Sequence, residues 1–552
     1  MLVLSNLYPP QHVGGYELRC QSVVDGLRRI GHEVFVLTGR FRGDALGASE
    51  NDVARVLHVG WGPPYPPEDL TGLLLCEASD RRALAEAIAA RRPEVVDVWG
   101  MEFASQSLVA GLLASGGAAV HVTLEDTWLR DAYTRDPLCA LTQITDDLGV
   151  ELPASIRRLC CLGLERPHVG AARVCFVSGA LAELYSEAGF RSVNAGVRIA
   201  GIDPAPFRRI KPAEPPPPFV ILNVGQLTAS RGHMELIEAA ARVAADESCP
   251  WPIVVRIVGG GGDDYVGTLK GLAKRVASDK LRVEFVGEVA PPRIAESYGN
   301  AHLFVFASRL PEGLPRVLME AMAAGVPIIA TNTGGQRDIL EAGRWGKLVA
   351  ARSTAALAGA IRDAVVNLPD WQARARSARR HAFEQFAIEH YVRGHAQDLI
   401  ETASGGVAPN EPLGAVAEPT ANELDGFGRA LGAAAQEHAE RMDVGAEPEN
   451  AWRMGVVLKR ARRPDAAEAL FARLRDAGAN VASQRRATFH LAELAMARGD
   501  WSQAVDLLGQ CLSVAPDHAK AAFDLRYAER ERLPEHLAAL REGARRGAVT
   551  LQ

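Results

Sequence analysis

The chain has 552 residues, more than one ordinary hydrophobic core accommodates, so we expect two to four domains. Hydrophobic residues make up 48% of the chain and charged residues 23%, as in soluble globular proteins. A formal net charge of -6 argues against a nucleic-acid-binding protein, because such proteins carry a surplus of basic residues. We therefore expect no nucleic acid among its partners.

Cysteine and histidine spacing predicts no metal site. The eight cysteines include no Cys-x2-Cys pair, and the fourteen histidines form neither His-x3-His nor His-Glu-x2-His. We expect free thiols in a reducing compartment. The chain opens on a strand-like segment without a signal sequence, and it has no run of eighteen apolar residues. These features predict a cytoplasmic protein whose membrane contact is at most peripheral, on the inner face of the membrane. The segment that could make such contact is the amphipathic stretch 155–164, for which burial in the fold is the simpler interpretation.

Residues 1–208 alternate short β-branched runs with longer amphipathic stretches. Such alternation predicts a doubly wound, Rossmann-like α/β domain. Buried parallel strands are expected at 1–5, 34–37, 95–98, 119–123 and 174–177, with helices at 21–30 and 80–90.

A glycine pair follows the first strand and opens a helix. Glycine lets the backbone approach an anion, and the positive end of the helix dipole favours one. Gly14 and Gly15 are therefore candidate phosphate-binding residues, although a tight turn is the simpler interpretation of a glycine pair alone.

Proline-rich residues 211–218 form a stiff linker, after which a second α/β alternation begins. Residues 209–400 are thus expected to form a second Rossmann-like domain that ends in helices over 371–399. Its strands are expected at 220–224, 254–258, 283–286, 303–308 and 328–330.

Two carboxylates separated by seven residues follow the strand at 303–308. Glu312 lies just beyond the carboxyl end of that strand, where ligands bind in open parallel sheets. Glu320 is expected about two turns down the next helix, near the face onto which Glu312 opens. One carboxylate reaching a sugar hydroxyl and the other reaching ribose hydroxyls would explain the pair, and two solvated charges are the alternative.

The remainder of the chain is expected to be helical. Residues 401–425 form a loop-rich linker, and 426–552 contain helical hairpins with starts at Ala451, Ala487 and Ala521, roughly 34 to 36 residues apart. This period predicts a tetratricopeptide-like repeat domain whose expected use is contact with a protein partner. A generic α-helical tail is the alternative.

The segment from Glu312 to Glu320, with the Ala-Met-Ala-Ala-Gly-Val-Pro that follows it, resembles the Glu-x7-Glu signature of family 4 glycosyltransferases. These are retaining enzymes of the GT-B fold, and the resemblance covers roughly the first 395 residues. It implies an α/β protein with an N-terminal acceptor-side domain and a C-terminal nucleotide-sugar-binding domain, followed here by the all-α repeat domain.

The resemblance implies a metal-independent, hexosyltransferase-type glycosyltransferase. Such an enzyme moves a sugar from a nucleotide-diphosphate sugar to an acceptor hydroxyl with retention of configuration. No cofactor is implied besides this co-substrate, and the acceptor would be a sugar, a lipid-linked molecule or a protein. The product would belong to polysaccharide, glycolipid or other glycoconjugate synthesis.

The donor site implied by the resemblance lies mainly in the second domain. Residues 223–232 resemble a Gly-Arg-Leu-x3-Lys-Gly loop, in which Arg231 keeps the charge of the lysine and Gln226 lacks the charge of the arginine. Gly259 matches a glycine loop near the donor. The expected donor-binding residues are Gly14, Gly15, Gly225, Gln226, Arg231, Gly259, Glu312, Gly313, Leu314 and Glu320.

The expected catalytic residues are Glu312, Arg231 and Glu125. Arg231 would stabilise the leaving diphosphate, Glu312 would orient sugar hydroxyls, and Glu320 would hold the ribose. Glu125 stands where the family often has a histidine. A carboxylate there could accept a hydrogen bond from a sugar hydroxyl or act as a base, but it cannot donate as neutral imidazole does.

Two departures from the family pattern, Gln226 and Glu125, favour a second hypothesis. Under it the chain is a catalytically degenerate glycosyltransferase-like scaffold that recruits partners through its helical repeats. The intact carboxylate pair, Arg231 and the glycine loops favour the enzyme. A third alternative is another GT-B activity, such as nucleotide-sugar epimerisation or phosphorolysis, although the pyridoxal lysine motif expected of a phosphorylase is not found in the sequence.

Overall fold

The computed structural model describes two compact units. The sheet unit comprises residues 1–66, 74–142 and 154–418, and the helical unit comprises 67–73, 143–153 and 419–552. The residues whose structure is described are 1–12, 15–40, 52–58, 70–101, 104, 106–115, 118–130, 141–159, 172–190, 194–211, 213–405, 419–478, 480–514, 521, 525 and 528.

The first sheet of the sheet unit has seven parallel strands in the order β3-β2-β1-β4-β5-β6-β7. Its central strands are buried along their whole length, as expected for a parallel sheet covered on both faces. The strands are β1 (Leu2–Ser5), β2 (Phe35–Arg40), β3 (Val53–His58), β4 (Val95–Val98), β5 (Ala119–Leu124), β6 (Arg173–Phe176) and β7 (Ala195–Val197). The helices between them are α1 (Gly15–Arg29), α2 (Leu70–Arg91), α3 (Gln106–Ser115), α5 (Leu141–Leu148), α6 (Ala154–Leu159) and α7 (Gly179–Glu187), and the 3-10 turn η1 (Ala205–Phe207) follows β7.

The second sheet has six parallel strands in the order β10-β9-β8-β11-β12-β13. Its strands are β8 (Phe219–Val224), β9 (Ile253–Val258), β10 (Leu281–Gly287), β11 (Leu303–Phe306), β12 (Ile328–Thr331) and β13 (Lys347–Val349). Its helices are α8 (His233–Ala244), α9 (Asp263–Val276), α10 (Pro291–Gly299), α11 (Arg316–Ala324), α12 (Gln336–Ile339) and α13 (Thr354–Val366), with 3-10 turns η2 (Ala229–Arg231) and η3 (Glu341–Gly343).

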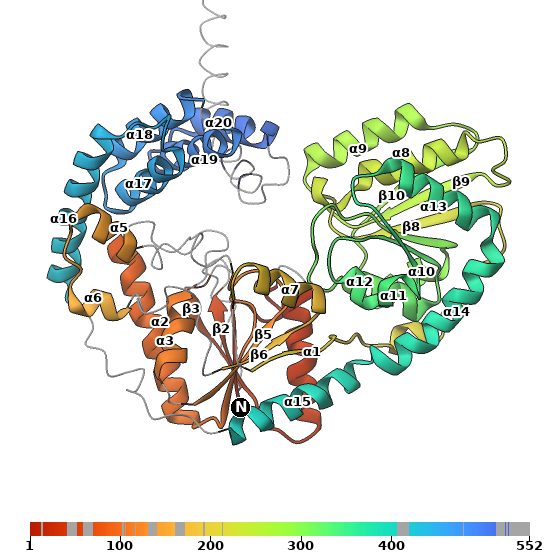
Figure 1. Cartoon of the computed structure of the whole chain (residues 1–552), viewed down its shortest axis with the longest axis horizontal. Helices are drawn as coiled ribbons and strands as arrows, with labels where there is room; N and C mark the ends of the chain where they lie inside the picture. Colours follow the sequence, from red (N-terminus) through yellow and green to blue (C-terminus); the bar gives the residue numbers. More distant parts are fainter. Residues whose placement is uncertain are drawn as a thin grey trace, which may run out of the picture. The chain divides into compact units, whose positions relative to one another are not determined.

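After the second sheet the chain returns to the first domain through α14 (Leu368–Gln385) and α15 (Ile388–Ser404). The amide of Ile202 donates to the carbonyl of Phe386, and the amide of Ile388 donates to the carbonyl of Ile202, both at 2.8 Å. Helix α15 lies beside α1, where Gly26 leaves room for the side chain of Val392 (Figure 1). The predicted class, two doubly wound α/β domains followed by helices, is confirmed.

Three short strands, β3, β7 and β13, were not expected from the sequence. β7 and β13 have only three residues each, and β3 carries a charged residue, Arg55, at one of its buried positions. All three are strands because they pair with a neighbouring strand. Such pairing cannot be predicted from the local hydrophobic pattern of the sequence. Of the amphipathic stretch 155–164, residues 155–159 lie in α6, and the rest lies outside the described residues.

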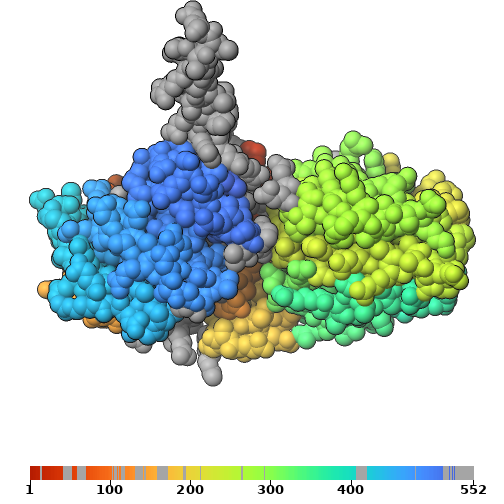
Figure 2. Space-filling view, turned by 90° about the horizontal axis from the view of Figure 1, so that it is seen from above, coloured from red at the N-terminus to blue at the C-terminus, as the bar shows by residue number. Residues whose placement is uncertain are grey.

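The helical unit contains α16 (Ala421–Arg441), α17 (Pro448–Arg460), α18 (Pro464–Asp476), α19 (Val481–Ala497) and α20 (Trp501–Val514), seen in blue in Figure 2. Thr420 caps α16 through a reciprocal capping box with Glu423. The segment predicted as a linker, 401–425, therefore overlaps α15 at one end and α16 at the other. The third predicted repeat, from Ala521 onward, lies almost entirely outside the described residues. Within the described chain, no helix is both long and apolar enough to cross a bilayer.

Candidate active site

Glu312 and Arg231 meet at the carboxyl end of the second sheet. Glu312 lies in the loop between β11 and α11, and Arg231 ends the turn η2 after β8. The Arg231 guanidinium pairs with Glu312 Oε1, which also accepts a hydrogen bond from the Ser308 hydroxyl at 3.0 Å. The side chains are 31% and 22% exposed, so both remain accessible to a ligand. Two residues expected at the donor are thereby brought together.

Glu320 is held rigidly inside the same domain. Helix α11 begins at Arg316, so Glu320 lies one turn, not two, from its start; the loop that carries Glu312 takes up the remaining residues. The carboxylate is buried, and it accepts hydrogen bonds from the Tyr298 hydroxyl and from Arg316 Nε, each at 2.9 Å. These two partners fix its rotamer before any ligand arrives.

The two glycine loops of the second domain touch each other. Gly225 and Gly259 follow the neighbouring strands β8 and β9, and both have positive φ angles, 154° and 141°. A Cβ atom at Gly259 would lie 1.9 Å from the carbonyl oxygen of Gly225. Only glycine permits this close approach of the two backbones at the end of the sheet. Gln226 follows Gly225 and is exposed.

The loop 312–314 is fastened to the first domain. The Ser178 hydroxyl donates to the carbonyl of Gly313 at 2.6 Å. A Cβ atom at Gly313 would lie 1.7 Å from the carbonyl oxygen of Glu125, which follows β5 of the first sheet. Leu314, next in the loop, is buried. The backbone at Glu125 therefore lies against the carboxylate loop, although the two segments belong to different sheets.

The side chain of Glu125 turns to helix α1. Its Oε2 pairs with Arg19 at 2.9 Å, and the two side chains are 9% and 4% exposed. Oε1 is buried, and it has no hydrogen-bond partner in the described part of the chain. Burial raises the pKa of Glu125 to about 7 in spite of the attraction of Arg19. The raised pKa brings the protonated form of Glu125 within reach of neutral pH, so the expectation that this residue cannot donate holds only for its ionised form.

Helix α1 begins beside the same strand end. Gly15 is its first residue, and Gly14 lies outside the described residues. The Tyr16 hydroxyl donates to the carbonyl of Thr123 at 2.6 Å. The positive end of the helix dipole, which favours an anion, is therefore anchored next to the end of β5.

Three residues that serve this site were not found from the sequence: Arg19, Ser308 and Tyr298. Each contacts a predicted carboxylate. Arg19 pairs with Glu125, Ser308 donates to Glu312, and Tyr298 donates to Glu320. Arg19 is separated from its partner by more than a hundred positions in the chain, and no short motif contains both. Ser308 lies only four residues before Glu312, so its position at the end of the strand is a local signal for a hydrogen bond to that carboxylate.

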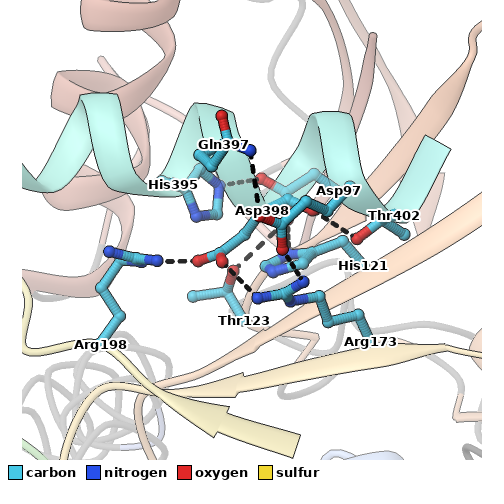
Figure 3. Close-up of polar contacts among 10 residues, drawn as sticks. Asp97, His121, Thr123, Arg173, Arg198, His395, Gln397, Asp398 and Thr402 are labelled. Atoms are coloured by element: carbon cyan, nitrogen blue, oxygen red, sulfur yellow. Dashed lines mark hydrogen bonds and ion pairs between the residues drawn. The ribbon is translucent and has the colours of Figure 1, made fainter. Parts of the chain in front are cut away.

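A separate buried cluster has the side-chain types of a metal site. Asp97 on β4, His121 on β5 and His395 on α15 converge, with their ligand atoms within 4.8 Å of one another (Figure 3). His121 Nδ1 lies 2.9 Å from one Asp97 oxygen, and His395 Nε2 and Trp99 Nε1 lie 2.7 Å from the other. Burial opposes ionisation of Asp97, but the charge of His395 and the bonds from both histidines outweigh it, so its pKa is lowered. An ionised carboxylate only accepts, so both imidazoles donate to it, whereas His121 Nε2 and His395 Nδ1 are buried without a hydrogen-bond partner among the described residues.

A neighbouring group, His121, Cys175 and Asp398, also has metal-ligand chemistry. Asp398 accepts hydrogen bonds at 2.6 Å from Arg173 and from Arg198 (Figure 3). Two guanidinium groups on the one carboxylate repel a further cation. These residues instead join α15 to the first sheet by ion pairs.

Comparison with known proteins agrees with this geometry. Residues 205–381 match the family model described as glycosyl transferases group 1. Spore coat protein SA of Bacillus subtilis is 31% identical over 130 residues, which cover 24% of this chain and 34% of that protein. D-inositol 3-phosphate glycosyltransferase of Rhodococcus opacus is 31% identical over 177 residues, covering 32% and 39%. The chain thus spans between a third and two fifths of the length of these relatives.

Two solved structures share the fold. Sucrose-phosphate synthase of Thermosynechococcus elongatus is similar with a TM-score of 0.55 and 18% identity, covering 73% of this chain and 99% of that one. Anabaena HepE in complex with UDP and glucose gives a TM-score of 0.51 at 20% identity, covering 72% and 99%. The sheet unit is therefore a GT-B fold.

Proposed function

We propose that this protein is a glycosyltransferase that moves a hexosyl group from a nucleotide-diphosphate sugar to an acceptor hydroxyl, with retention of configuration and without a metal ion. The observation that carries the proposal is the convergence of Arg231, Glu312 and the loop 312–314 with the chain at Glu125. Carboxylates and a guanidinium beside bare glycine backbone suit a ligand that has both hydroxyl and phosphate groups.

Arg231 has the main electrostatic role in this proposal. Its guanidinium carries five N–H donors, so it can keep its bond to Glu312 and still bind the diphosphate. As the bond between the anomeric carbon and the phosphate oxygen breaks, negative charge grows on the diphosphate. A fixed cation there stabilises the transition state more than the ground state. The α1 terminus at Gly15 would add its dipole to the same effect.

The departing diphosphate would also serve as the base. The acceptor oxygen bonds to the anomeric carbon on the face that the phosphate leaves, and the acceptor proton passes to a phosphate oxygen. Glu312 would hold sugar hydroxyls, and Glu320 would hold ribose hydroxyls. Precise alignment of the two reactants then supplies much of the rate acceleration.

The proposal also covers the biosynthetic role, the protein partner and the location of this protein. We place the activity in glycoconjugate synthesis, with the helical unit as a contact surface for a protein partner and a cytoplasmic location. The two helical hairpins α17–α18 and α19–α20 support the repeat interpretation, since their first helices start 33 residues apart, at Pro448 and Val481.

The donor site is tested by binding. A thermal-shift screen of the full chain against UDP-, GDP- and ADP-sugars, with and without EDTA, should give a shift for one nucleotide class that EDTA does not alter. Calorimetry on Glu320→Ala should then find nucleotide affinity reduced roughly 10- to 100-fold, because hydrogen bonds to charged groups contribute about 1.5 to 3 kcal/mol.

The matched control is Glu296→Ala, an exposed carboxylate on the neighbouring helix α10, which should bind as the wild type does. An unchanged dissociation constant in Glu320→Ala would remove the ribose assignment. A folded wild type that binds no nucleotide sugar would instead favour the degenerate scaffold.

A further inference from the structure

Two cationic side chains lie together at the carboxyl edge of the first sheet, away from the residues of the proposed donor site. Arg40 is the last residue of β2, and His58 is the last residue of β3. The strands pair in parallel, with Arg40 and His58 as register partners. Partners on adjacent parallel strands are roughly 5 Å apart, with side chains on the same face. The two charges are therefore held side by side by the sheet itself.

Asp80 of α2 holds His58 in its charged form. Asp80 Oδ1 lies 2.7 Å from His58 Nδ1, and both of its oxygens accept from the backbone N–H of His58, at 3.2 and 3.1 Å. The hydrogen bond to Asp80, assisted by one to Cys76, raises the pKa of His58 to about 10. Asp80 is almost fully buried, whereas the His58 side chain is 37% exposed. The imidazolium thus keeps its carboxylate partner beneath it and a face open to solvent.

Arg40 is exposed, and its position is also fixed. Its Nε donates to the carbonyl of Arg55 on β3 at 3.1 Å, which leaves the other nitrogens of the guanidinium for a ligand. Arg55 itself is buried, and it donates to the carbonyls of Tyr8 and Pro9 at 2.6 and 2.7 Å. Those carbonyls belong to the loop between β1 and α1. The cationic pair is therefore tied to the segment that leads to the predicted phosphate-binding glycines.

We infer that Arg40 and His58 form a phosphate-binding subsite for the acceptor. This inference rests on the proposed transferase function for its role, because it names the acceptor class of that same site. The guanidinium and the imidazolium carry two positive charges, of which Asp80 below His58 offsets one, so a net positive charge faces a phosphate monoester. The carboxyl edge of a parallel sheet is where such ligands bind.

The strand order sets the length of this acceptor. β3 and β5 are four strand spacings apart in the sheet, roughly 19 Å, and Glu125 follows β5. Arg40 lies on β2, one strand closer to β5, and its long side chain shortens the distance further. The phosphate and the reacting hydroxyl are therefore expected on the order of 10 to 15 Å apart. One phosphorylated sugar ring is too short to bridge them. The acceptor is a phosphorylated oligosaccharide or a phospholipid-linked sugar, which present the same chemistry from two sources.

The first test uses inorganic phosphate on the full chain. Histidine labelled with carbon-13 at Cε1 gives separate ring signals, and the signal of His58 is assigned by its loss in His58→Gln. Phosphate at constant ionic strength should shift that signal, with half-saturation on the order of 1 to 10 mM. Chloride should not.

Arg40→Gln should weaken this response at least about fivefold, since it removes one of two charges while the His58–Asp80 pair remains. Arg29→Gln, an exposed arginine at the end of α1, is the matched control and should respond like the wild type. A His58 signal that ignores phosphate, or an undiminished response in Arg40→Gln, would overturn the subsite.

The second test distinguishes a soluble acceptor from a lipid-linked one. It also distinguishes failure of the phosphate subsite from failure of the transferase proposal. Trehalose 6-phosphate, glucose 6-phosphate and phosphatidylcholine vesicles with or without phosphatidylinositol are compared as ligands by the same His58 signal. A response to the disaccharide phosphate favours a soluble acceptor, and a response to phosphatidylinositol vesicles favours a lipid one. A response confined to glucose 6-phosphate would overturn the length estimate. Nucleotide-sugar binding is measured separately, so a protein that binds phosphate at His58 but no nucleotide sugar keeps the subsite and loses the transferase proposal.

Discussion

At the scale of single residues, the environment of Glu125 decides what its carboxyl group can do. The side chain is buried against Arg19, and burial raises its pKa to about 7. A protonated carboxyl donates one hydrogen bond, as neutral imidazole does, whereas a carboxylate only accepts. The raised pKa therefore makes a neutral form of Glu125, which can donate a hydrogen bond, accessible near neutral pH.

The two roles of Glu125 give opposite pH dependence. If the protonated form donates to the donor sugar, kcat/KM should fall as pH rises through about 7, because that form is lost. Glu125→Gln, which donates at every pH, should lack this limb and keep activity above pH 8. The check is a pH profile of donor hydrolysis or transfer for both proteins.

The exposed Glu187 at the end of α7 supplies the control, and Glu187→Gln should follow the wild-type profile. Activity that instead rises with pH through 7, and is abolished in Glu125→Gln, would assign the residue as a base.

At the scale of elements, helix α15 behaves as part of the first domain although it follows the second in sequence. Its His395 donates to Asp97 on β4, and its Asp398 pairs with Arg173 and Arg198 at the β6–β7 edge (Figure 3). These bonds combine with the packing of α1 on α15 at Gly26. Charge networks and close helix contact together fix where the returning chain ends.

Asp97→Asn should loosen α15. The amide cannot accept from both imidazoles and from the indole of Trp99, so buried donors lose their partner at a cost of about 3 kcal/mol or more. Urea unfolding should report this loss, and amide hydrogen exchange should rise in α15. Asp25→Asn, an exposed position on α1, should leave both measurements unchanged.

The same network predicts how stability depends on pH. The pKa of Asp97 is below its ordinary 3.8, so its contribution is present above about pH 4 and is lost as pH falls towards the folded-state value. Burial lowers the pKa of His121 below 6.5, and this contribution likewise decreases as pH falls below that value. The free energy of unfolding should therefore decline on acidification, and less steeply in Asp97→Asn.

At the scale of the whole molecule, the helical unit includes segments from outside the C-terminal part of the chain. Residues 67–73 and 143–153 group with 419–552, although both segments leave from the first domain. Leu70, Thr145 and Leu152 in these segments are buried. The helical unit is therefore built from three separate segments of the chain.

Ending the chain at residue 418 should reduce stability as well as remove the repeat. Leu70 and Leu152 are buried and belong to the same compact unit as the removed residues, and each would cost up to about 1.5 to 3 kcal/mol if the truncation exposed it. We expect a lower thermal midpoint and loss of donor hydrolysis. A chain that ends at residue 528 is the control. An unchanged midpoint and unchanged hydrolysis in the shorter chain would mean that the repeat serves only its partner.

The sequence by itself determined the two α/β alternations, most of their strands and the carboxylate segment with its glycine loops. These signals are local, because apolar runs and glycine positions depend on the conformation of a few neighbouring residues. Only the tertiary structure decided the partners of those residues. Arg19 beside Glu125, Tyr298 beside Glu320 and Arg40 in register with His58 arise from chain packing over long separations. Burial and pKa follow from that packing, so the raised pKa of Glu125 was set by its burial, which no local pattern could report.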